Sequence, residues 1–149
     1  MRLLLAIFVA LICGRASAQQ TITNDFAVRF RAVDIYVDSK DKPLAAYQIE
    51  FSVTNGNAKI VGIEGSDHRA FSAPPFYDAK AIQNERVIIA AFSTNAVSNL
   101  PKGKTRIATI HIQTSLAEEP ELELKLQAAA DSNGNKIPAE ASAEERKPK

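Results

Sequence analysis

The residues whose spacing most clearly suggests a binding site lie near the C-terminus, in the stretch AAADSNGNKIPAE. Asp131, Asn133 and Asn135 occupy positions 1, 3 and 5 of a loop, which are oxygen-ligand positions in an EF-hand calcium loop. That loop also requires glycine at position 6 and glutamate at position 12, where this chain has Lys136 and Ser142. One carboxylate would give weak affinity, so we expect no cofactor and keep calcium as an alternative.

The same residues are typical of a tight turn between two strands. Asn133-Gly134 tolerates positive φ, and the Asp131 side chain can accept a backbone N–H in an Asx-turn. We therefore predict a chain reversal between a strand at 121–130 and a short strand at 136–139.

Two histidines supply the remaining candidates for acid–base or metal chemistry. His68 follows Asp67, and such a pair can act as a general base or as half of a metal site. Adjacent residues rarely direct their side chains to one point, so a solvated loop histidine is the favoured interpretation and a small hydrolase is the alternative. His111 falls on the outward face of a predicted strand, and two distant histidines give too few donors for a transition-metal site.

Other catalytic signatures are missing from the sequence. No serine lies in a G-x-S-x-G elbow, and no glycine-rich phosphate loop occurs. The carboxylates fall on exposed strand faces and in turns, whereas a glycosidase needs two of them facing each other across a cleft. We therefore expect that the protein is not an enzyme.

Aromatic residues bear on sugar binding, because flat rings commonly form the platforms on which glycans stack. The chain has no tryptophan and three tyrosines. Tyr47 falls on an inward strand face, which leaves Tyr36 and Tyr77 as candidates for exposure. Because so few aromatic residues are available to stack on a sugar, polysaccharide binding is an alternative rather than the leading hypothesis.

The N-terminal stretch MRLLLAIFVALICGRASAQQ has the organisation of a secretory signal peptide. A basic residue, Arg2, precedes an apolar run at 3–13 that is too short for a membrane-spanning helix of about 20 residues. A small-residue A-x-A site then ends at Ala18. We predict a signal peptide at 1–18, cleaved after Ala18.

Two alternatives to cleavage at this site remain open. A lipoprotein signal would acylate Cys13, but such signals prefer small residues where this chain has Leu11 and Ile12. The apolar run would otherwise be kept as an N-terminal anchor.

Cleavage would remove the only cysteine, so the mature chain could form no disulfide. Such a composition fits a bacterial periplasmic or exported protein better than a small secreted domain stapled by disulfides. Loss of Arg2 and Arg15 from the 18 basic residues leaves 16 against 17 acidic ones, a net charge of −1. A near-neutral chain without a basic run is not expected to bind nucleic acid. We expect a secreted or periplasmic protein with no membrane span after signal cleavage.

Apolar residues in the mature chain recur with a period of two, which predicts strands rather than helices. The stretch VIIAAF at 87–92 is apolar on both faces, so we predict a central strand buried on both sides. Near the C-terminus, Leu122, Leu124, Leu126 and Ala128 are predicted to face the core. The segments with strand patterns are VDIYVD, AAYQIEFSV, AKIVGIEG, VIIAAF, TRIATIHIQT and ELELKLQAAA.

The alternation is lost at 65–86, where a double proline forbids a central strand. We predict a long surface loop there, held partly by Phe71, Phe76 and Tyr77.

The spacing of strands and turns indicates an all-β fold, an antiparallel β-sandwich, as a single domain at 27–139. Residues 19–26 are assigned to an N-terminal linker. Residues 140–149 contain no apolar side chain larger than alanine, so we predict a disordered polar tail.

Several strings in order along the chain resemble the cohesin-like modules of bacterial secreted proteins, over about residues 33–137. The strings are VDIYVDSKDKPLAAYQIEFSV, AKIVGIEG, RVIIAAFST, LPKGKTRIATIHIQT and AAADSNGNKI. The resemblance implies a jelly-roll sandwich with cohesin-like, Ig-like topology, of a fold shared with carbohydrate-binding modules of cellulases. It also implies a non-catalytic role in protein–protein binding.

By this resemblance, the partner would be another secreted or envelope protein, with a dockerin-like module as one form of it. The partner surface would lie on an exposed sheet face. The outward-facing residues considered for that surface are Tyr36, Asp38, Gln48 and Glu50, with Ser52 and Asn95.

Overall fold

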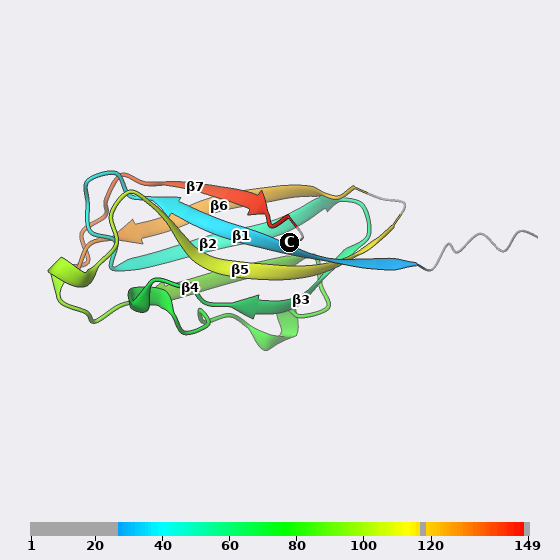
Figure 1. Cartoon of the computed structure of the whole chain (residues 1–149), viewed down its shortest axis with the longest axis horizontal. Coiled ribbons are helices and arrows are strands. Elements are labelled where there is room, and N and C mark those ends of the chain that lie inside the picture. Colours follow the sequence, from blue (N-terminus) through cyan, green and yellow to red (C-terminus); the bar gives the residue numbers. More distant parts are fainter. Residues whose placement is uncertain (1–26, 117–118, 148–149) are drawn as a thin grey trace, which may run out of the picture.

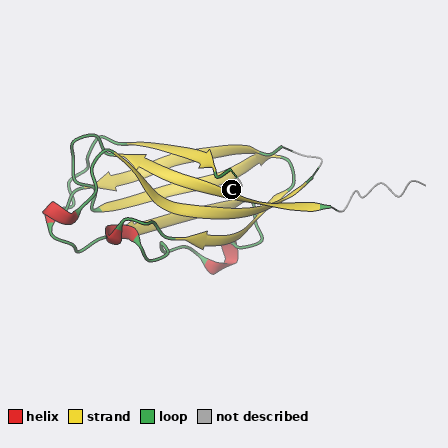
Figure 2. Cartoon of the chain, in the orientation of Figure 1, coloured by secondary structure: helices red, strands yellow, loops and turns green. Residues whose placement is uncertain are grey.

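The computed structural model describes residues 27–116 and 119–147, which fold almost entirely as β-strands (Figure 1). Three short 3-10 helices lie in the connections before and after β4 (Figure 2), and the described part contains no α-helix. The strands are β1 (Val28–Asp38), β2 (Ala46–Asn55), β3 (Ala58–Glu64), β4 (Arg86–Phe92), β5 (Lys104–Ser115), β6 (Glu121–Ala130) and β7 (Glu140–Glu145). The 3-10 helices are η1 (Arg69–Phe71), η2 (Ala79–Ala81) and η3 (Val97–Asn99).

The strands form two antiparallel sheets. The four-stranded sheet has the order β3-β5-β1-β7, and the three-stranded sheet has the order β4-β2-β6. The longest pairing joins β1 to β5, from Val28 opposite Ser115 to Asp38 opposite Lys104. The prediction of an all-β fold built from antiparallel strands is therefore confirmed.

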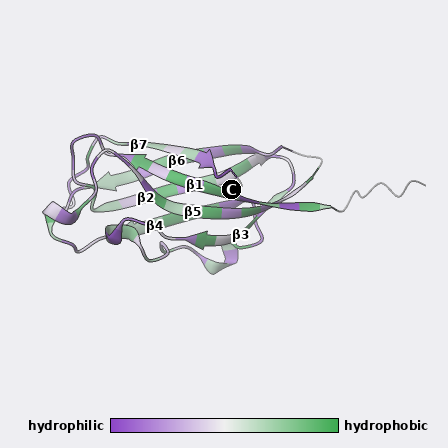
Figure 3. Ribbon diagram, viewed as in Figure 1, coloured by the Kyte–Doolittle hydropathy of each residue, from purple (hydrophilic) through white to green (hydrophobic). Residues whose placement is uncertain are grey.

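One hydrophobic core lies between the two sheets. Alternate residues of β1, among them Val33 and Ile35, are fully buried, and Ile49 and Phe51 of β2 face them from the other sheet. Figure 3 shows the corresponding alternation of hydrophobic and hydrophilic residues along the strands. The core forms because a period of two places every second side chain on the same face of a strand.

A β-bulge shifts the pattern of burial at the end of β6. Ala128 was predicted to face the core, but it is exposed and Ala129 is buried instead. The register explains the difference, because Gln48 lies opposite Ala128 while the next residue of β2, Ile49, lies opposite Leu126. The extra residue of β6 reverses the inward face beyond the bulge.

The prediction that 87–92 forms a central strand buried on both sides is wrong. β4 is the edge of the three-stranded sheet, and only its inward residues Val87 and Ile89 are fully buried. Phe92, on the outward face, is exposed. Burial alternates because the inward face of this sheet packs on the core and its outward face meets solvent.

The prediction of a disordered tail at 140–149 is wrong for 140–145, which form β7. This strand pairs with β1 from Glu140 opposite Asp38 to Glu145 opposite Val33. The stabilising contacts are a backbone ladder, ion pairs, and two small side chains, Ala141 and Ala143, that pack against the core. The sandwich domain thus continues past 139, and the short strand predicted at 136–139 reduces to one bridge between Ala130 and Lys136.

The long connection between β3 and β4 is anchored at Phe71. Its ring is buried and meets Tyr47 edge-on, with 5.2 Å between ring centroids. Phe76 and Tyr77, which were predicted to help hold this loop, are instead exposed. Gly65 also fixes the loop, because the backbone of Ser72 packs where a Cβ would lie.

The predicted signal peptide at 1–18 and linker at 19–26 lie outside the described residues. Among the residues that the structure describes, no helix is long and apolar enough to cross a lipid bilayer.

Candidate functional site

The free edge of β4 is extended by a single residue of the preceding loop. The amide of Phe76 donates to the carbonyl of Ala90 at 2.8 Å, and the amide of Ala90 donates back to Phe76 at 2.9 Å. This bridge brings the Phe76 ring beside that of Phe92, with centroids 6.2 Å apart and planes inclined by only 11°. The backbone pairing thus positions the two phenyl rings nearly parallel to each other.

The Phe76–Phe92 pair is largely exposed to solvent. The two residues are 70 % and 65 % exposed, and Tyr77 beside them is also exposed. Phenylalanine is among the residues most often buried, and contiguous exposed apolar side chains are typical of interaction sites. The pair is therefore the strongest candidate for a binding surface in the described part of the chain.

A groove of about 250 Å³ runs beside this pair. It is lined by residues 69–74 together with Phe76, Ala91 and Phe92. We call it the Phe groove. Its lining residues are apolar except for Ser72 and Arg69, so it can accept an apolar side chain and one anionic neighbour.

A polar ladder lies on the outward face of the same sheet, next to the apolar pair. The Glu50 carboxylate accepts hydrogen bonds from Arg86 at 2.6 Å and from Gln127 at 3.1 Å. Gln48 donates to Gln127 at 2.5 Å. The hydrogen bond and charge of Arg86 hold the pKa of Glu50 below its ordinary value. These polar groups already have hydrogen-bond partners within the protein, as at the polar rim of a protein interface.

The structure does not bring the predicted partner-surface residues together. Gln48 and Glu50 lie on the outward face of the three-stranded sheet, whereas Tyr36 and Asp38 belong to the four-stranded sheet. The Tyr36 ring packs under the Lys104 ammonium, 4.8 Å from it. Asp38 accepts hydrogen bonds from the amide and ammonium of Lys40, which lower the pKa of its carboxyl group.

The other two outward-facing residues considered also have defined places. Ser52 stands opposite Arg86 in the pairing of β2 with β4. Asn95 lies in the connection after β4, where its amide donates to Ser93 at 3.3 Å.

The Asx-turn predicted around Asp131 is confirmed. One carboxylate oxygen of Asp131 accepts the backbone amides of Asn133 and Asn135, both at 2.9 Å, and the other accepts the Asn135 side chain at 3.2 Å. Hydrogen bonding from the Asn135 amide lowers the pKa of Asp131. The described residues contain no group of three His, Cys, Asp or Glu placed to hold a metal, and calcium binding stays a prediction.

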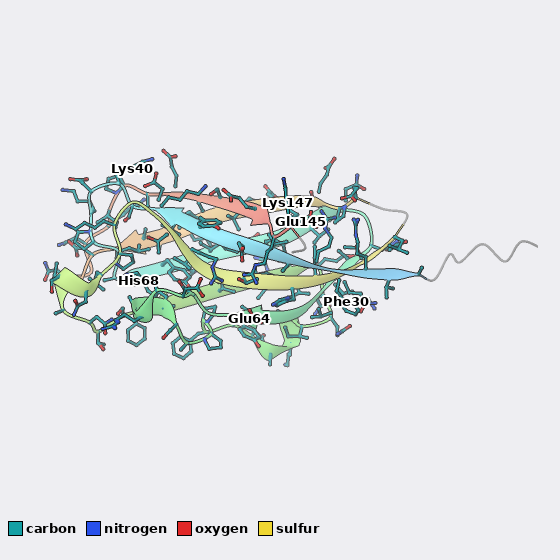
Figure 4. The ribbon with its side chains drawn as sticks, in the orientation of Figure 1. Phe30, Lys40, Glu64, His68, Glu145 and Lys147 are labelled. Atoms are coloured by element: carbon teal, nitrogen blue, oxygen red, sulfur yellow. The ribbon has the colours of Figure 1, made fainter. Side chains whose placement is uncertain are left out.

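Asp67 and His68 are engaged with different partners. The Asp67 carboxylate forms an ion pair with Arg106 at 2.5 Å. His68 Nδ1 accepts the amide of Ala70 at 3.2 Å, which caps η1. Figure 4 shows His68 at the end of the molecule where this short helix lies. Asp67 and His68 line a shallow depression together with residues 98–100. Asp67 is the only acidic residue among those that line it.

Sequence reasoning missed a buried polar cluster on the outward face of the four-stranded sheet. Asp34 is 8 % exposed and accepts hydrogen bonds from Thr109 and Arg146, while Arg106 lies 3.7 Å away. A period of two puts Asp34 on the same outward face as Tyr36 and Asp38, but the residues that cover it come from distant parts of the chain. The Phe76–Phe92 pair was missed because Phe92 was assigned to a strand buried on both sides.

Comparison of the chain with protein-family models, with curated proteins and with solved structures finds no match.

Proposed function

We propose that the protein is a non-catalytic module that binds another protein through the outward face of its three-stranded sheet. The observation that carries this proposal is the stacked and exposed Phe76–Phe92 pair at the edge of that face. Burying a phenylalanine side chain gains about 1.5–3 kcal/mol, so two rings supply a large part of a moderate affinity. The ladder of Gln48, Glu50 and Gln127 would form the polar side of the interface.

The proposal includes a cohesin-like sandwich with jelly-roll topology. Two antiparallel sheets around one core, with an unpartnered sheet face, support this assignment. In such a module the scaffold is rigid and the exposed face carries the specificity.

The proposal also includes export to the periplasm or beyond the cell, with a secreted or envelope protein as partner. Its support is the apolar leader and the A-x-A site at residues 16–18.

Polysaccharide binding is the second candidate function. The specific observation in its favour is the exposure of two nearly parallel rings, Phe76 and Phe92, inclined by 11°, since an exposed aromatic face can stack on a sugar ring. Protein binding is preferred because neither ring carries a polar group to orient a sugar hydroxyl, and the chain has no tryptophan.

The experiment uses the mature chain, 19–149, as immobilised bait for a native envelope fraction. The test variant replaces both Phe76 and Phe92 by alanine. The control is Phe30→Ala, because Phe30 is equally exposed at 67 % but belongs to the other sheet. We expect a protein that wild type and the control both retain and the double variant loses.

Two results would contradict the proposal. One is capture that does not depend on the Phe76–Phe92 pair, and the other is failure to retain any specific protein. Affinity electrophoresis of the same three proteins through a panel of polysaccharides tests the second candidate. Retardation that the double variant loses would favour glycan binding.

A further inference from the structure

Arg69 stands apart from the other arginines of the described chain. Each of the others forms an ion pair with a carboxylate: Arg29, Arg31, Arg86, Arg106 and Arg146. Arg69 is exposed and has neither an ion pair nor a hydrogen bond from its side chain within 27–116 and 119–147. Among the arginines of the described chain, Arg69 is therefore the one that is available to pair with an anionic group of a partner.

Arg69 lines two neighbouring surface depressions. It lines the Phe groove, where it is the only charged residue, and it also lines the neighbouring depression beside His68. The nearest acid in sequence, Asp67, is already paired with Arg106. The electrostatic complement of the groove is therefore an anionic group.

The size and walls of the groove define the rest of the ligand. A volume of about 250 Å³ would hold several waters at about 30 Å³ each, which is enough for one large apolar side chain. Phe71, Phe76 and Phe92 supply aromatic walls, and Pro74 and Ala91 add apolar surface. An apolar side chain would displace poorly bound water from such a site.

We propose that the Phe groove receives a partner segment in which an apolar side chain lies within two residues of an aspartate or glutamate. The apolar side chain enters the Phe groove against the rings of Phe71, Phe76 and Phe92, and the carboxylate pairs with Arg69. This inference rests on the proposed protein-binding function and specifies the chemistry of the partner. Arginine is suited to the task because its planar guanidinium pairs with a carboxylate through two parallel hydrogen bonds.

The test is a selection from an unbiased library of random octapeptides displayed on phage, with the mature chain as target. Peptides that also bind the Phe92→Ala variant are discarded. We expect the remaining peptides to share an apolar residue with Asp or Glu nearby. The same selection on Arg69→Glu should instead favour Lys or Arg near the apolar residue, because the sign of the site is reversed.

Affinities of one selected peptide and its Glu-to-Gln counterpart then measure the contribution of the charge. Arg69→Gln should weaken the acidic peptide about fivefold, as for an exposed ion pair, and leave the neutral peptide unchanged. The Arg69 side chain has no ion-pair or hydrogen-bond partner among residues 27–116 and 119–147, so this variant should unfold at the wild-type temperature.

The possible results distinguish failure of the acidic-partner proposal from failure of the proposed protein-binding function. Phe92-dependent peptides without an acidic preference, or with the same preference on Arg69→Glu, would overturn the acidic partner and leave protein binding standing. Absence of any Phe92-dependent peptide would overturn both.

Discussion

The guanidinium of Arg146 binds both carboxylate oxygens of Asp34, with distances of 2.6 Å from Nη2 and 3.1 Å from Nε. Asp34 lies in the middle of β1 and Arg146 directly follows β7, so the contact joins residues 112 positions apart. Thr109 of β5 donates to the same carboxylate at 2.7 Å and accepts from Arg106 at 2.6 Å. The end of the chain is thereby fixed to the centre of the four-stranded sheet.

Replacing Asp34 by asparagine should lower the free energy of unfolding by about 2 kcal/mol. The change keeps the shape but removes the charge that receives two guanidinium hydrogen bonds at a buried position. Urea denaturation measures the effect. The control is Asp41→Asn, because Asp41 is exposed and its one ion pair, to Lys42, is long at 3.6 Å. Equal effects of the two substitutions would contradict the structural role of Asp34.

The Asp34 contribution should also depend on pH. Burial alone would raise the pKa of this carboxyl group, but hydrogen bonds from Arg146 and Thr109 and the nearby positive charges together lower it below its ordinary value of 3.8. A carboxyl group with a lowered folded-state pKa stabilises the fold above its unfolded-state pKa and ceases to do so as the pH falls through the folded-state value.

The difference in unfolding free energy between wild type and Asp34→Asn should therefore be constant between about pH 5 and 7, and should shrink below about pH 4. Urea titrations of both proteins across this range measure it. A difference that grows as the pH falls would contradict the assigned hydrogen bonds.

Removal of β7 should destabilise the fold and promote association. A chain ending at Ala139 loses Arg146 and uncovers the edge of β1, which then presents unpaired backbone groups. The ion pairs Lys40–Glu140 and Arg31–Glu145 at either end of this strand are lost as well. Figure 4 labels one residue of each pair, Lys40 and Glu145. We expect a loss of at least about 2 kcal/mol in urea denaturation, and oligomers by light scattering.

The matched control for this truncation ends at Arg146. It removes only 147–149 and keeps both β7 and the contact with Asp34, so it should behave as the wild type. A stable monomer from the shorter chain would show that β7 is dispensable.

Two glycines near the end of β3 should respond differently to alanine. A Cβ on Gly65 would lie 2.4 Å from the carbonyl oxygen of Ser72 and 2.5 Å from that of Ala73. The loop backbone would have to move, which should cost about 2 kcal/mol. On Gly62 the nearest atom is Cδ2 of His111 at 3.7 Å, so Gly62→Ala should stay within about 0.5 kcal/mol of wild type. Thermal unfolding compares them, and similar losses would argue against the close packing at Gly65.

Sequence reasoning predicted the strands that carry large apolar residues, because alternation along a strand is a local property. It located the inward faces of β1 and β2 for this reason. It missed β7, in which only Ala141 and Ala143 pack against the core. The ion pairs that hold β7 join it to Arg31 of β1 and Lys104 of β5, at separations of 114 and 40 residues, and no local pattern signals them.

The candidate site was harder to predict than the fold, because it depends on strand order. An apolar stretch such as 87–92 has the same pattern whether its strand is central or at an edge, and only the sheet topology shows that Phe92 is exposed. The stacking of Phe76 on Phe92 further depends on one backbone bridge to Ala90. The division of Tyr36 and Gln48 between two sheets has the same origin.

The most direct test of the proposed docking face is site-specific photo-cross-linking in the producing cell. A photoreactive phenylalanine analogue is placed at Phe92 in one protein and at Phe30 in another, positions of nearly equal exposure on different sheets. We expect a specific protein adduct from position 92 and none from position 30. An adduct from position 30 alone, or no protein adduct from position 92, would contradict it.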